Sequence, residues 1–200
     1  MRKVCQYFFS PNSPWSYLGH ARFVAMARQH GVQIEVCPFD LGKVFGASGG
    51  LPLAKRSPQR QAYRLTELGR WSDHLDLPIN VQPKFFPVSP DAAAKLIVGT
   101  RLALGVEVAL DLSQAIMHGL WADERNIGDT DTLVQIANSR ELDGRMLLKS
   151  SETASVQAEY ERNTDDAMAA SVFGAPWYVF DGEGFWGQDR LDFLERAFSK

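Results

Sequence analysis

The sequence has few of the residues that build disulfide scaffolds, metal centres and membrane spans. Its two cysteines, Cys5 and Cys37, lie far apart and form no CxxC pair, and its four histidines show no HExxH or other metal-ligand spacing. No apolar run approaches the roughly 18 residues of a membrane-spanning helix. A formal charge of −3 gives no electrostatic reason to expect nucleic acid or an anionic membrane as a partner. These absences argue against a disulfide-rich protein, a metal site, a membrane protein and a nucleic-acid-binding protein.

What is present is the composition of an ordinary globular protein. Hydrophobic residues make up 45% and charged residues 22% of the 200 positions, a length that fits one domain. The apolar stretch near the N-terminus ends at Ser10-Pro11-Asn12, which makes it too short for the apolar core of an export signal. We therefore predict a single domain over residues 1–200 that stays in the cytoplasm.

The first forty residues predict a strand, a helix and a second strand. Residues 4–9 are β-branched and aromatic, and turn residues follow them. A helix is predicted next, with Ser13 as its N-cap, Pro14 at its first position and a stop at Gly31. Residues 32–39 then alternate apolar and polar side chains. One short turn separates these elements, which predicts a right-handed parallel βαβ unit.

The rest of the chain changes character twice. Residues 41–55 are rich in glycine and predict a loop, and the next hundred residues show helical periodicity with almost no strand signal. Helices are predicted near 58–76, 90–104, 106–121, 130–138 and 151–170. A strand at 177–180, a tight turn at 181–184, a short strand at 185–186 and an amphipathic helix at 189–198 end the chain. This order predicts an α/β, thioredoxin-like fold (βαβ … ββα) with an inserted all-helical subdomain at approximately 58–170.

The junction of the first strand and first helix carries the most informative motif, Ser13-Pro14-Trp15-Ser16. Thioredoxin-like proteins place CxxC there, because the helix N-terminus lowers the pKa of a thiol. Serine stands at both cysteine positions here, and no base lies beside it to make a serine nucleophile. One interpretation is that an external thiolate occupies the helix end and accepts a hydrogen bond from Ser13 Oγ. The alternative is that Ser13 only caps the helix.

Two further segments bear on a ligand. Ala175-Pro176 directly precedes the third strand, where a thioredoxin-like fold carries a cis-proline that exposes the backbone of the preceding residue to a peptide-like ligand. The alternative is an ordinary trans-proline at the start of a strand. At the start of the last helix, Asp189 either caps the helix or meets an α-ammonium group, and Gln188 is placed to bond the α-carboxylate of the same ligand.

Together these segments resemble a known family. Four segments carry the resemblance: Ser13-Pro14-Trp15-Ser16-Tyr17-Leu18, Arg70-Trp71, Val172-Phe173-Gly174-Ala175-Pro176 and Phe185-Trp186-Gly187-Gln188-Asp189-Arg190-Leu191. Their order and spacing are similar to the 2-hydroxychromene-2-carboxylate isomerase family, which is related to kappa-class glutathione transferases within the DsbA-like thioredoxin superfamily. The resemblance covers essentially the whole chain.

The resemblance implies a homodimeric enzyme that uses glutathione as cofactor on a small aromatic or electrophilic substrate. It implies that a glutathione thiolate adds to a double bond of the substrate and later leaves it. Ser13 matches the catalytic serine that holds the sulfur. The cofactor-binding positions would be Arg60, Ala175, Pro176, Gln188 and Asp189. A kappa-like transferase that releases the conjugate, and a binding module without catalysis, are the alternatives.

Several positions depart from that family or stand outside its site. Ala175 replaces a larger aliphatic residue, and Trp177 stands where threonine is more common, so we expect both to reshape the pocket floor beside the sulfur. Lys43 matches an isomerase lysine only loosely, and a solvated loop lysine is the alternative. Cys5 and Cys37 are predicted to be buried structural residues on neighbouring strands. Without a cysteine at position 13 or 16, disulfide oxidoreductase chemistry has no attacking thiolate.

Overall fold

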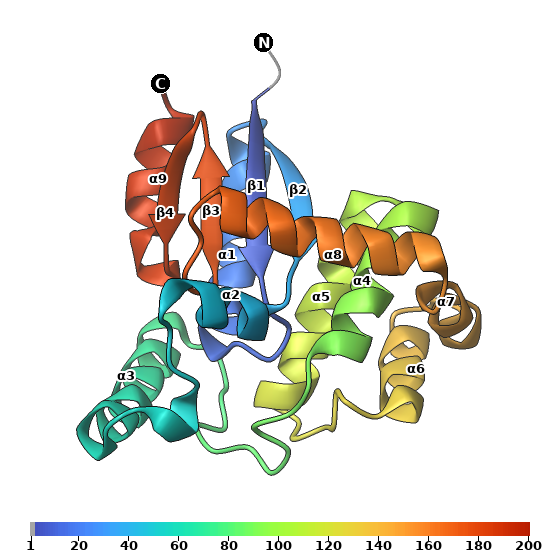
Figure 1. Cartoon of the computed structure of the whole chain (residues 1–200), viewed down its shortest axis with the longest axis horizontal. Coiled ribbons are helices and arrows are strands. Elements are labelled where there is room, and N and C mark those ends of the chain that lie inside the picture. Colours follow the sequence, from blue (N-terminus) through green and yellow to red (C-terminus); the bar gives the residue numbers. More distant parts are fainter. Residues whose placement is uncertain (1–2) are drawn as a thin grey trace.

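The protein, described over residues 3–200 by a computed structural model, is built on one mixed four-stranded sheet (Figure 1). The strand order is β2-β1-β3-β4. β1 pairs in parallel with β2 and antiparallel with β3, and β3 pairs antiparallel with β4. The strands are β1 (Val4–Phe9), β2 (Gln33–Pro38), β3 (Trp177–Phe180) and β4 (Glu183–Trp186).

The helices follow the predicted order and confirm the thioredoxin-like fold with its helical insert. Helix α1 joins the two parallel strands, α3 to α8 lie between β2 and β3 in the sequence, and α9 follows the terminal hairpin. The helices are α1 (Pro14–Gln29), α2 (Leu41–Ser48), α3 (Pro58–Leu75), α4 (Asp91–Leu104), α5 (Val106–Trp121), α6 (Thr130–Ser139), α7 (Gly144–Ser151), α8 (Ala154–Ala169) and α9 (Leu191–Phe198), with 3₁₀ turns at Leu53–Lys55 and Gln188–Arg190.

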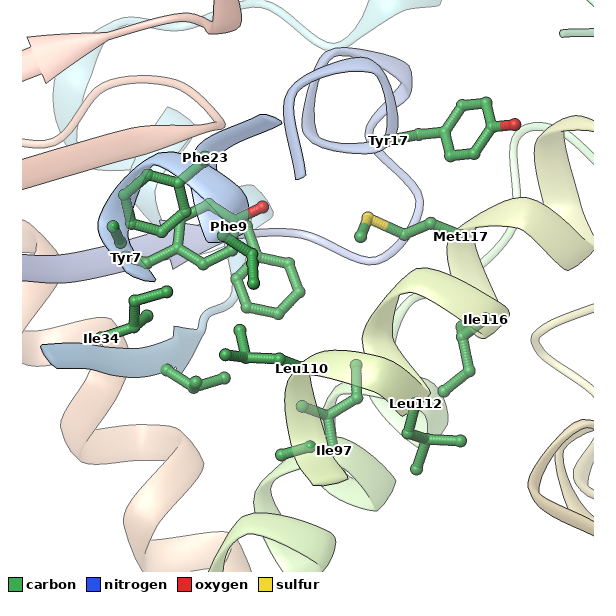
Figure 2. Close-up of a cluster of buried hydrophobic side chains, with 14 of the residues drawn as sticks. Tyr7, Phe9, Tyr17, Phe23, Ile34, Ile97, Leu110, Leu112, Ile116 and Met117 are labelled. Atoms are coloured by element: carbon green, nitrogen blue, oxygen red, sulfur yellow. The ribbon is translucent and has the colours of Figure 1, made fainter. Parts of the chain in front are cut away.

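The alternation of side chains along the strands divides the core into two layers. Tyr7 of β1 and Tyr178 of β3 point to the α1 side, where their rings stack at 5.4 Å. This larger core continues into α4 and α5, as Figure 2 shows for Leu110 beside the sheet residues. Phe8 and Trp177 point to the opposite face, where α2 and α8 cover them (Figure 1). Burial of such side chains stabilises the fold by about 1.5–3 kcal/mol each.

The prediction of a loop over 41–55 is wrong. Helix α2 occupies the first half of this segment, with Asp40 as its N-cap: the carboxylate accepts hydrogen bonds from the N–H groups of Gly42 and Lys43. The helix ends at Gly49 in the left-handed conformation. Because glycines lower helix propensity, the local sequence pattern does not predict this helix. Val44 is buried in the second core, the layer around Phe8 and Trp177 on the sheet face that α2 and α8 cover. This burial supplies the tertiary stabilisation that the local sequence lacks.

Two other elements differ from their predicted bounds. Helix α7 was not predicted separately; it starts where the Asp143 carboxylate accepts a hydrogen bond from the Met146 N–H. The hairpin turn is only two residues long, because Asp181 and Gly182 both have positive φ angles, at 51° and 78°. Strand β4 therefore starts at Glu183, earlier than expected. Across residues 3–200, no helix combines the length and the apolar character needed to cross a bilayer.

Candidate functional site

Ser13 lies at the N-terminus of α1 and caps it. Its Oγ accepts a hydrogen bond from the Ser16 N–H at 3.2 Å, and Pro14 occupies the first helical position. The predicted capping role is therefore present. It uses only an acceptor lone pair of Oγ and leaves the hydroxyl proton free for another partner.

The hydroxyl proton of Ser13 points to the second predicted segment. The peptide bond between Ala175 and Pro176 is cis, and Ser13 Oγ donates to the Ala175 carbonyl oxygen at 3.4 Å. This distance exceeds the usual 2.5–3.0 Å range of O–H···O bonds. Because the bond is long, the hydroxyl is held weakly and a better acceptor at the helix end can redirect it.

Backbone N–H groups complete an anion-binding corner. In the part of the chain that the structure describes, neither the Trp15 N–H nor the Ala175 N–H has a hydrogen-bond acceptor. The N-terminus of a helix carries about half a positive elementary charge. The first turn of α1 contains no acidic residue that would neutralise it. A hydroxyl donor, free N–H groups and a helix dipole thus converge where an anion would be stabilised.

The segment 187–189 is joined to this corner by its main chain. The Gly187 N–H donates to the Pro176 carbonyl at 2.9 Å. Gln188 is 1% exposed, and its Oε1 accepts a hydrogen bond from Arg22 of α1 at 2.9 Å. Its side chain thus packs under α1 and does not face solvent. The Asp189 carboxylate is exposed, pairs with Arg190 at 2.6 Å and caps neither the 3₁₀ turn nor α9.

The loop between α3 and α4 is hydrogen-bonded to the N-terminal end of α1, a contact that the sequence does not predict. Asn12 Nδ2 donates to the Val88 carbonyl at 2.8 Å, and the Tyr17 hydroxyl donates to the Pro78 carbonyl at 2.8 Å. The sequence marks Asn12 only as a residue that ends the first strand. Nothing local in the sequence signals its partner, which lies 76 positions away.

Within residues 3–200, neither of the two remaining basic candidates forms a side-chain hydrogen bond or an ion pair with the residues of this corner. Arg60 is exposed on the first turn of α3 and forms no ion pair with any residue in 3–200. Lys43, on α2, lines a separate polar recess of about 140 Å³ with Asp40, Asp91 and Lys95. The structure therefore brings Ser13 together with Ala175–Pro176 and the 187–189 segment, and does not place Lys43 with them.

Trp177 and the cysteines lie in the interior. The Trp177 ring packs in the core layer that α2 and α8 cover, edge-on against Phe173 at 4.8 Å. Cys5 and Cys37 are buried and unbridged on the neighbouring strands β1 and β2, as predicted. Burial raises the pKa of both thiols far above its ordinary value, so neither is poised as a thiolate.

These features define a thioredoxin-like protein in which serines replace the redox cysteine pair at the helix end. The family model described as DSBA-like thioredoxin domain matches residues 4–199. The chain is 30% identical over 196 residues to a 2-hydroxychromene-2-carboxylate isomerase of Sphingobium xenophagum, covering 98% of this chain and 97% of that protein. The chain therefore belongs to the DsbA-like thioredoxin family and, within it, to the 2-hydroxychromene-2-carboxylate isomerase family.

Two further comparisons agree with this assignment. A protein of Caenorhabditis elegans named glutathione S-transferase kappa 2 is 28% identical over 217 residues, covering 98% of this chain and 94% of that protein. The solved structure of a 2-hydroxychromene-2-carboxylate isomerase superposes with a TM-score of 0.84 at 22% identity, covering 98% of this chain and 94% of that one. At that identity the superposition shows the shared fold.

Proposed function

We propose that the protein is a glutathione-dependent isomerase that acts on a small aromatic substrate with an electron-poor double bond, of the 2-hydroxychromene-2-carboxylate type. The observation that carries the proposal is the Ser13 hydroxyl, weakly held beside Ala175 at the N-terminus of α1. The names of the isomerase and kappa-transferase relatives support both the reaction type and the thiol.

The chemistry of the corner fits glutathione. The unused N–H of Ala175 and the nearby carbonyl suit the main chain of a small peptide. The exposed Asp189 carboxylate suits its α-ammonium group, and the exposed, unpaired Arg60 suits a terminal carboxylate. The buried side chain of Gln188 cannot reach a ligand without leaving Arg22, so we assign Gln188 a main-chain contact.

The chain's own part in the reaction is positioning and electrostatics. Glutathione supplies, when bound, a thiolate for reversible addition to the double bond, which leaves a rotatable single bond and no net redox change. Ser13 Oγ would donate a hydrogen bond to the thiolate sulfur, while the Ser16 N–H keeps the oxygen in place. The dipole of α1 favours the ionised thiol over the neutral one. The low exposure of Ser13, 6%, keeps competing water away from that hydrogen bond.

A kappa-like transferase is the second candidate, favoured by the 28% identical relative of that name. The two reactions share their first half and differ in whether the sulfur is eliminated again. Recovery of free glutathione after a rise in isomerised product indicates the isomerase. Accumulation of a stable conjugate indicates the transferase. Assembly as a homodimer also stays a prediction, to be checked by the mass of the protein in solution.

The experiment that tests the proposal is an ultraviolet titration of the glutathione thiolate against pH, with wild-type protein and with Ser13→Ala. We expect the thiol bound to wild type to ionise at least one pH unit below free glutathione, and most of that shift to vanish in the variant. Glutathione that does not bind, or binds with an unshifted thiol, would refute the proposal. An unchanged shift in Ser13→Ala would remove Ser13 from the mechanism.

A further inference from the structure

Arg64, on α3, is a buried cation that forms no ion pair with any described residue. Its side chain packs against two adjacent aromatic rings, with Cζ 5.1 Å from the Phe86 ring centroid and 5.7 Å from that of Trp121. The residue is only 9% exposed, and its Nη2 is buried with no hydrogen-bond partner anywhere in residues 3–200. A buried guanidinium that lacks a counterion is costly, because water no longer solvates the charge.

Trp121 presents a second donor of the same kind. It lies at the end of α5, is fully buried, and its Nε1 also lacks an acceptor among the described residues. Its ring lies 4.8 Å from that of Phe86, so Arg64, Phe86 and Trp121 form one packed group. Both unused groups are N–H donors, and neither has an acceptor oxygen within residues 3–200. A ligand that satisfies them must bring acceptor oxygens.

Positively charged side chains near Arg64 favour a negatively charged ligand. Arg60 lies one helical turn before Arg64, and Arg56 lies just before the start of α3. Arg56 is close enough to both Arg60 and Arg64 for their like charges to repel. Arg56 donates only to the carbonyl oxygen of Leu51. No carboxylate among residues 3–200 forms an ion pair with any of the three. Burial and this repulsion lower the pKa of Arg64 to about 10. An anion would relieve both costs.

The Arg64 group is tied to the helix end that carries Ser13. Phe86 lies in the same loop as Val88, whose carbonyl holds Asn12, the residue before Ser13. The same loop is bonded to Trp121, because the Asn80 N–H donates to the Trp121 carbonyl at 2.6 Å. The loop between α3 and α4 therefore contacts both the anion-binding corner at Ser13 and the group formed by Arg64, Phe86 and Trp121.

We propose that Arg64 and Trp121 bind the carboxylate of the electrophilic substrate, with the Phe86 ring against its aromatic part. The inference deepens the proposed function and rests on it for its catalytic meaning. Arg64 is then the specificity-determining residue that favours aromatic carboxylates over neutral electrophiles. Two parallel N–H groups of a guanidinium match a carboxylate, and a charge-assisted hydrogen bond of this kind is worth a factor of about ten or more in affinity.

Binding of a non-reactive probe tests the site without glutathione. Cinnamate and the uncharged cinnamamide are titrated calorimetrically into the ligand-free protein. We expect cinnamate to bind wild type at least tenfold more tightly than cinnamamide, and this preference to disappear in Arg64→Met. Arg64→Lys keeps the charge but not the planar fork, so a partial preference is expected. Arg196→Met is the matched control, because Arg196 lies over the Phe193 ring at 5.6 Å on the exposed face of α9.

The results separate this inference from the proposed function. Equal affinity for the two probes, as a water molecule bound to the two donors would give, overturns the carboxylate site, and so does an unchanged preference in Arg64→Met. Circular dichroism melting checks the fold of each variant, and Arg64→Lys keeps the test open if Arg64→Met does not fold. A cinnamate preference that depends on Arg64, together with no binding of glutathione, would leave the site standing and refute the glutathione proposal.

Turnover supplies a second readout. With glutathione present, benzylidenepyruvate and benzylideneacetone offer the same electrophilic double bond with and without a carboxylate. We expect Arg64→Met to raise KM for the carboxylate about tenfold or more while changing KM for the ketone less than threefold. An equal change for both substrates would indicate a merely structural role and overturn the proposal.

Discussion

Ser13 Oγ lies 3.4 Å from the carbonyl oxygen of Ala175, although the two residues are 162 positions apart in the sequence. Ser13 Oγ also accepts a hydrogen bond from the Ser16 N–H. Capping therefore uses a lone pair of the hydroxyl group, and donation uses its proton. The two interpretations that the sequence left open for Ser13 are therefore compatible. The cap fixes the oxygen in space, and the proton stays available to a sulfur anion.

Replacing Ser13 by alanine removes both roles, and they can be separated. We expect Ser13→Ala to lose about 1 kcal/mol of stability, as the loss of a helix cap does. Glutathione-dependent turnover should fall about a hundredfold, the usual effect of removing one preorganised donor. Asp143→Ala is the control, because it removes the cap of α7 in a part of the fold away from the corner. Turnover near the wild-type level in Ser13→Ala, or an equal loss in Asp143→Ala, would contradict the role of Ser13.

The sequence predicts the strands and most helices because their signals are local. Caps such as Ser13 and the glycine stop at Gly31 mark helix ends, and period-two alternation marks the parallel strands. Helix α2 escaped prediction because its stability comes from contacts with α8 and the second core and not from its own glycine-rich sequence. The position of Ser13 on the strand–helix junction was predictable for the same local reason.

The partners of the site residues could not be predicted from local patterns. The inward rotation of Gln188 depends on Arg22, which lies 166 positions away. The burial of Arg64 depends on a loop that folds Phe86 against it. An amphipathic helix pattern marks Arg64 as an ordinary helical arginine. Only tertiary packing shows that its Nη2 is buried without a hydrogen-bond partner among the described residues. These features of the site depend on contacts between residues far apart in the sequence, which composition and spacing do not reveal.

Gly187 positions the 188–189 segment, and its substitution should affect ligand binding. Its φ of 98° favours glycine, and a Cβ there would collide with the Asp189 carboxylate. We expect Gly187→Ala to lose about 1–2 kcal/mol of stability and to weaken glutathione binding severalfold by displacing that carboxylate. Gly182→Ala is matched, since its φ is 78° but nothing lies within 4 Å of the added Cβ. It should lose similar stability in chemical denaturation with unchanged glutathione affinity; a similar affinity loss in both variants would argue against Asp189 as a ligand.

The two cysteines should be inert in the folded protein. Cys5 is fully buried and Cys37 nearly so, and burial raises the pKa of each thiol. We expect a disulfide reagent at pH 7 to label neither within the time that labels both in denaturant. Ser13→Cys places a thiol at the helix N-terminus, where the helix dipole lowers the thiol pKa. This thiol should react with the reagent at least ten times faster than Cys5 and Cys37 do in the native protein. Rapid labelling of the native wild type would show that the strands open, and would contradict the structural role of both residues.

His20 makes the fold sensitive to acid. Its Nε2 lies 3.0 Å from the Leu110 carbonyl and must donate to it, so Nδ1 accepts the Tyr7 hydroxyl proton at 3.2 Å. This network needs the neutral ring. Burial lowers the pKa of His20 from 6.5 to about 4 in the folded protein. Between these values the unfolded chain binds a proton that the folded chain does not bind.

Stability should therefore fall as the pH drops from 6.5 to about 4 and depend no further on His20 below that value. The total loss from this group is about 3 kcal/mol, measured as the free energy of unfolding in urea across the pH range. His20→Gln removes this titrating group. The variant should be less stable at neutral pH, and the slope of its unfolding free energy against pH should be smaller than that of wild type by nearly one proton. His74→Gln, at an exposed position on α3, should keep the wild-type slope. A wild-type slope in His20→Gln would mean that other groups cause the acid sensitivity.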